Sequence, residues 1–242
     1  MENKSKNKSD YLVQGTILVV ASFVARVIGM VYRIPLTNIL GDTGTGYYST
    51  ANEIYSIILM ISSFSMPLAV SKLVSERLSA GEKKNAYRVF LCSMRFSAIL
   101  GAVMALATFL LAGVITKYLM SVEYASYALR VLAPAIFIFA IVGVFRGSFQ
   151  GHGTMVPTAV SQVIEQIVNA VVSVVCAALF MSIGASHGDE LLASAYGAAG
   201  GTSGTVVSVA VALAFLAYAR AAYRKSLKRQ LRRDYPRRRE AD

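Results

Sequence analysis

Charged residues are scarce in this chain of 242 residues: 15% are Asp, Glu, Lys or Arg, while 55% are hydrophobic. Soluble domains carry about 25% charged residues, so the shortage excludes an ordinary soluble fold and indicates an integral membrane protein. Tryptophan is absent, and an aromatic belt at the membrane surface would therefore use tyrosine. The two cysteines, Cys92 and Cys176, fall within apolar stretches, which argues against a disulfide framework.

The residues needed for enzymatic chemistry are scarce as well. The two histidines, His152 and His187, are solitary, and the GDTGTG stretch at residues 41–46 lacks the strand-then-helix setting of a phosphate-binding loop. The apolar stretches contain no Ser/His/Asp set and no acidic metal motif. The sequence therefore predicts a protein that is not an enzyme, with no catalytic centre, no metal site and no cofactor.

Apolar stretches of about 20 residues are typical of helices that cross a membrane. Six such stretches lie near residues 12–34, 48–70, 89–115, 128–149, 156–183 and 190–219. The sequence thus predicts an all-α, polytopic bundle of six transmembrane helices. We expect an N-terminal segment over 1–11, a transmembrane lobe over 12–219 and a basic segment over 220–242. That last segment would be a cytoplasmic tail that contacts anionic lipids, or a truncated linker between lobes.

The net charge of +11 is unevenly distributed along the chain. Basic residues precede the first predicted span, lie between the second and third, and follow the sixth, with Arg146 closing the fourth. The loops on the opposite side, near 35–47, 116–127 and 184–189, contain a single basic residue, Lys117. By the positive-inside rule, both termini are cytoplasmic. The basic excess therefore indicates the topology of a multi-pass membrane protein rather than a nucleic-acid partner.

Two arginines, Arg26 and Arg33, interrupt the first apolar stretch. Their seven-residue spacing is about two helical turns and places them on one face of a helix. An arginine near the middle of a span costs at least about 2.5 kcal/mol to insert, unless it faces protein or water. Asn52 and Glu53 begin the second span, and Glu53 is positioned to pair with either arginine. The remaining positive charge would suit an anionic ligand, such as a phosphate bound bidentately.

Polar residues also form a stripe along the fifth span. They follow helical spacing and comprise Gln162, Glu165, Gln166 and Asn169. Such a stripe is either the wall of a polar cavity or a set of hydrogen bonds between helices. In the sixth span, Gly197, Gly200, Gly201 and Gly204 predict either a close approach to another helix or a bend.

Three stretches of the chain resemble a known family. They are ARVIGMVYRIPLTNILGDTGTGYY, PLAVSKLVSE and FRGSFQGHGTMVPTAVSQVIEQIV. Over residues 14–220 the chain is similar to the stage V sporulation protein B group. This group includes lipid II flippases of the MurJ type and belongs to the multidrug/oligosaccharidyl-lipid/polysaccharide exporter superfamily.

The resemblance implies a two-lobed transporter that exposes a cationic central cavity to each side of the membrane in turn. Its substrate would be an undecaprenyl-diphosphate-linked saccharide, with lipid II as the leading candidate. Arg26 matches the first cavity arginine in the family's R-V-[LI]-G motif, and Arg33 matches the second with a spacing one residue longer. A third family arginine has no counterpart between Glu53 and Pro67. Family members have more spans than this chain, which therefore resembles the N-terminal lobe alone.

The leading hypothesis is a non-enzymatic flippase lobe that works with a second lobe. Arg26 and Arg33 would hold the diphosphate, and Glu53 would set their orientation and the local charge. Asn52 would also contact the substrate, and the stripe of the fifth span would line the cavity. One alternative is a cation-coupled multidrug exporter of the same superfamily, with Glu165 or Glu53 as the proton or sodium site. Another is a membrane scaffold for envelope synthesis that does not transport.

Overall fold

The structure, a computed structural model, describes residues 2–63, 65–186 and 188–239. Every regular element in these ranges is helical, which confirms the all-α prediction. The elements are α1 (Glu2–Val31), α2 (Arg33–Ser62), α3 (Met66–Ser79), α4 (Lys83–Val114), the π-helical turn η1 (Ile115–Leu119), α5 (Ala125–Gly151), α6 (Val156–Ala185) and α7 (Glu190–Arg239).

Six helical segments of the described chain are long and apolar enough to cross a membrane, as predicted. They are Val13–Val31, Arg33–Ser79, Lys83–Leu119, Ala125–Gly151, Val156–Ala185 and Glu190–Tyr223. Large apolar side chains cover the outside of the bundle, for example Phe23, Phe96 and Val171. This pattern is expected where lipid replaces water as the solvent, because helices satisfy their backbone polar groups internally.

The predicted outer loop near 35–47 is helical instead, because α2 begins at Arg33. Pro35 lies in the first turn of α2, where the missing backbone N–H of proline is not needed. The backbone turns at Gly41, with a φ of 65° and a ψ of −173°. Residues with a side chain rarely adopt a positive φ, so glycine is suited to this position.

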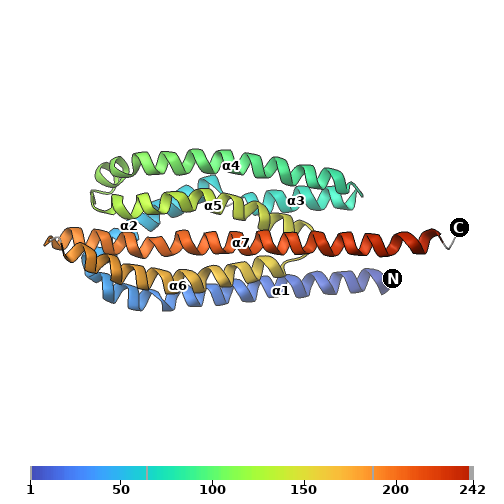
Figure 1. The fold of residues 1–242 in the computed structure, drawn as a ribbon, viewed down its shortest axis with the longest axis horizontal. Helices are drawn as coiled ribbons and strands as arrows, with labels where there is room; N and C mark the ends of the chain where they lie inside the picture. The colour runs from blue at the N-terminus through green and yellow to red at the C-terminus, as the bar shows by residue number, and fades with distance from the viewer. Residues whose placement is uncertain (1, 64, 187, 240–242) are drawn as a thin grey trace.

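The helices lie side by side along the long axis of the molecule (Figure 1). The start of α1 and the end of α7 lie at the same end of the bundle, as do the connections between α3 and α4 and between α5 and α6. The cytoplasmic placement of this end remains a prediction from the charge distribution. The segment 220–242 does not begin as a separate tail, because α7 continues through it to Arg239. Most side chains of this segment lie outside the part that the structure describes, so its contact with anionic lipids stays a prediction.

Close helix packing holds the bundle together around α5 and α7. A Cβ at Gly200 would overlap the carbonyl oxygen of Cys176, and one at Gly204 would stand 2.6 Å from the backbone nitrogen of Ser173. The glycines of α7 therefore permit close approach to α6, which confirms the predicted close approach to another helix. On the other side of the bundle, Gly147 of α5 packs against the backbone of α3 in the same way.

Candidate functional site

The polar stripe of α6 faces α1, and hydrogen bonds join the two helices along their length. These bonds run from Met155 N to Gln14 Oε1 (2.8 Å), from Ser22 Oγ to Gln162 Oε1 (3.0 Å) and from Asn169 Nδ2 to Tyr32 Oη (3.1 Å). The partners' residue numbers rise together, so α1 and α6 run parallel. Gln166 joins this interface, because its Oε1 stands 3.4 Å from where a Cβ of Gly29 would lie.

Asn169 links α6 to α7 and to the junction between α1 and α2 through its side-chain amide. Besides donating to Tyr32, it accepts hydrogen bonds at Oδ1 from Ser173 (3.0 Å) and from Thr205 of α7 (3.4 Å). The Tyr32 hydroxyl in turn lies 3.3 Å from the hydroxyl of Tyr48 on α2. Hydrogen bonding between helices is therefore observed for this part of the stripe. Lining of a substrate cavity by the same residues stays a prediction.

Removal of the Tyr32 hydroxyl tests how much this network contributes. We expect Tyr32→Phe to lower the free energy of unfolding by about 0.6 kcal/mol, the average for hydrogen bonds between membrane helices. Reversible unfolding in mixed micelles would measure the change. Tyr118→Phe is the matched control, since the exposed Tyr118 makes no hydrogen bond within the described residues. Equal stability of both variants and the parent would contradict a stabilising network.

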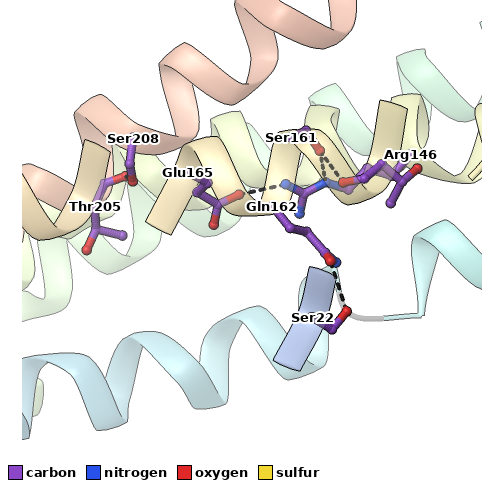
Figure 2. A network of polar contacts seen from close by, with 8 residues as sticks. Ser22, Arg146, Ser161, Gln162, Glu165, Thr205 and Ser208 are labelled. Atoms are coloured by element: carbon purple, nitrogen blue, oxygen red, sulfur yellow. Dashed lines mark hydrogen bonds and ion pairs between the residues drawn. The ribbon is translucent and has the colours of Figure 1, made fainter. Parts of the chain in front are cut away.

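Arg146 and Glu165 form an ion pair between α5 and α6 (Figure 2). Arg146 Nη2 lies 2.7 Å from Glu165 Oε2, and the two side chains are only 8% and 13% exposed. Arg146 Nε also donates to Ser161 Oγ at 3.1 Å, and Ser161 donates onward to the carbonyl oxygen of Thr158 at 2.7 Å. The guanidinium is thus neutralised and hydrogen-bonded within the bundle.

Sequence reasoning missed this pair, because it assigned Arg146 to the basic cytoplasmic ends. Arg146 is buried, unlike the arginines of a membrane surface. One signal was present in the sequence. Arg146 and Glu165 carry opposite charges and lie on either side of the short connection between two predicted spans, so a long arginine side chain can reach the carboxylate.

The arginines that the sequence singled out are on the outside of the described lobe. Arg26 and Arg33 are both exposed. Each follows a residue that faces the bundle, namely Ala25 and Tyr32, so its side chain leaves the helix about 100° away from the packed face.

The predicted partners of these arginines lie elsewhere. Glu53 is exposed between Ala51 and Ile54, which are both buried. It takes no part in the ion pairs found among the described residues, so the pairing expected with Arg26 or Arg33 is not observed there. Asn52 donates to the carbonyl oxygen of Tyr48 at 3.0 Å.

Solved structures of membrane transporters share this arrangement of helices. One is a multidrug resistance MATE family transporter of the MOP superfamily in an outward-facing conformation, with a TM-score of 0.70 and 19% identity. Another is a MOP superfamily transporter from Pyrococcus furiosus, with a TM-score of 0.63 and 19% identity. Each match covers 88% of this chain and 44% of the other chain. This chain therefore shares the fold of these two proteins and spans less than half the length of either.

The chain belongs to the polysaccharide biosynthesis protein family, whose model matches residues 12–234. Two relatives come from Bacillus subtilis strain 168. Stage V sporulation protein B is 28% identical over 152 residues, and lipid II flippase MurJ is 30% identical over 160 residues. The matches cover 63% and 62% of this chain but only 29% of each relative. The family resemblance is confirmed, and with its six membrane-long helices the chain is a multi-pass protein of the plasma membrane.

Proposed function

We propose that this chain is one lobe of an alternating-access flippase. The substrate is an undecaprenyl-diphosphate-linked saccharide, either lipid II or a polysaccharide precursor, which is moved across the membrane for envelope synthesis. The observation that carries the proposal is the pair of exposed arginines on α1 and at the start of α2, Arg26 and Arg33. The family relation to a protein named lipid II flippase supports the choice of substrate.

The arginines define which face of the lobe meets the substrate. Lipid on this face would cost at least about 2.5 kcal/mol for each arginine near the middle of a span. Glu53 forms no ion pair with either of them among the described residues. The face that carries Arg26 of α1 and Arg33 at the start of α2 therefore borders a water-filled cavity. A diphosphate entering this cavity meets two guanidinium groups, whose planar donors match phosphate oxygens.

The α6 stripe lies at the same height in the bundle as Arg26. The parallel pairing of α1 and α6 places Gln162 beside Ser22, and Gln166 against Gly29. Gln162 and Gln166 are partly exposed, so their amides are available to sugar or peptide groups bound next to the diphosphate. Asn169 is buried and acts through the helix contacts instead.

A second lobe completes the pathway in this proposal. The chain spans less than a third of its curated relatives and less than half of the transporters that share its fold. Rocking of one lobe against another around a central site is the usual mechanism of such transporters. The proposed partners are accordingly the second lobe, anionic membrane lipids and the lipid-linked substrate. The chain has no enzymatic step of its own.

Neutralising one arginine tests the diphosphate contact. In vesicles that contain the complete gene product, Arg26→Gln should slow lipid II translocation at least about tenfold, since a hydrogen bond to a charged group contributes about 1.5–3 kcal/mol. Arg33→Gln should act in the same direction. Arg95→Gln, which removes an exposed arginine from α4, should leave the rate unchanged. An undiminished rate with Arg26→Gln would refute the proposed role.

The alternatives predict different outcomes in the same vesicles. A cation-coupled multidrug exporter would show drug efflux that depends on Glu165 or Glu53 and no lipid II translocation. The ion pair with Arg146 counts against Glu165, because a guanidinium already occupies the carboxylate. A scaffold without transport activity would translocate nothing in any variant and would co-purify with glycosyltransferases.

A further inference from the structure

A second cationic site lies away from Arg26 and Arg33. An open pocket of about 410 Å³ is formed by residues of α3, α4, α5 and α7. Leu78 and Lys83 of its lining flank the α3–α4 connection and His152 lies in the α5–α6 connection, so the pocket is at the end of the bundle that holds these connections. Its lining includes three basic side chains, Lys83, His152 and Arg220, and none of the described residues that line it is acidic.

Arg220 is held in place at the wall of this pocket. The central carbon of its guanidinium stands 3.4 Å from the centroid of the Phe90 ring, which is a cation–π contact. Its Nη1 also donates to Ser148 Oγ at 2.8 Å. These two contacts come from α4 and α5, so the guanidinium of α7 has a fixed orientation between three helices.

His152 is oriented by the same part of α5. Its Nδ1 donates to the carbonyl oxygen of Ser148 at 2.7 Å. The ring also packs edge-on against Tyr223 of α7, with centroids 6.4 Å apart. Lys83 at the start of α4 and Arg220 of α7 are the cationic donors of the pocket.

We propose that this pocket binds the phosphate headgroup of an anionic phospholipid. Basic pockets between transmembrane helices at the cytoplasmic side are suited to phosphate-bearing lipid headgroups. The guanidinium of Arg220 and the ammonium of Lys83 supply the charge. Phe90, Phe149 and Leu78 give the same pocket apolar walls, which accommodate the glycerol and the first carbons of the acyl chains. A free phosphate shares the charge of the headgroup but has no apolar part that could pack against these walls.

Charge reversal at one lining residue tests the proposal. The purified chain in uncharged detergent is titrated with phosphatidylglycerol, and the bound lipid is counted by native mass spectrometry. Lys83→Glu changes the charge at this position by two units and should weaken binding at least about tenfold. Lys84→Glu is the matched control, because it changes the net charge equally at an adjacent exposed residue outside the pocket. It should change the affinity less than about twofold.

Two control titrations distinguish an anionic phospholipid from other ligands. Phosphatidylcholine should not bind, and millimolar inorganic phosphate should not displace phosphatidylglycerol. Equal weakening by Lys83→Glu and Lys84→Glu would overturn the proposal in favour of a diffuse surface charge. Displacement by inorganic phosphate would overturn it in favour of a soluble ligand. An unchanged unfolding profile for each variant would show that neither substitution disturbs the fold.

Discussion

Replacing Glu165 by alanine is expected to lower the free energy of unfolding by about 3–5 kcal/mol, because it leaves Arg146 buried without its countercharge. Arg146 has only Ser161 as another hydrogen-bond partner among the described residues at this site. A hydroxyl group cannot neutralise a guanidinium. The effect is measured by reversible unfolding in mixed micelles, or by the loss of folded protein after detergent extraction.

Replacing both residues of the pair separates the cost of an unpaired buried charge from the contribution of the ion pair itself. Arg146→Met combined with Glu165→Leu should recover most of the lost stability, since an apolar pair often replaces a buried ion pair at little cost. Glu123→Ala serves as the control at the exposed Lys117–Glu123 pair, whose side chains are 52% and 65% exposed. Its expected effect is below about 1 kcal/mol. Equal effects of Glu165→Ala and Glu123→Ala would contradict the buried pair.

Gly200→Ala is expected to destabilise the bundle by about 1–3 kcal/mol through overpacking. The new Cβ would stand 2.7 Å from the carbonyl carbon of Cys176 on α6. Backbone atoms cannot rotate out of the way as a flexible side chain does. The two helices must therefore move apart, and the hydrogen bond from Thr205 to Asn169 between them is disturbed.

The same substitution at another helical glycine provides the control. At Gly46 of α2, an added Cβ would have no neighbour within 4 Å. Gly46→Ala should therefore be neutral or stabilise the chain by up to about 1 kcal/mol, because alanine loses less backbone entropy than glycine on forming a helix. Both variants are compared by the same unfolding measurement. If Gly200→Ala behaves like Gly46→Ala, the close packing of α6 and α7 does not limit stability.

Composition and periodicity determined the helical character of this protein. Long apolar stretches must form helices in a membrane, because lipid offers no partners for backbone polar groups. On this basis alone, the stretches around Phe96 and Val171 are predicted to be transmembrane helices, and both are helices of membrane-spanning length in the structure. The glycines of α7 were likewise interpretable from sequence, since small residues at helical spacing are typical of close helix contacts.

The direction in which each polar side chain points was decided by the tertiary structure. Spacing placed Gln162 and Asn169 on one face of a helix, but only the pairing of α1 with α6 shows that this face meets Ser22 and Tyr32. The ion pair of Arg146 with Glu165 depends in the same way on how α5 and α6 lie together. Hydrophobicity fixes which segments enter the membrane. It does not fix their rotation or their neighbours, because lipid and apolar side chains solvate a helix face almost equally well.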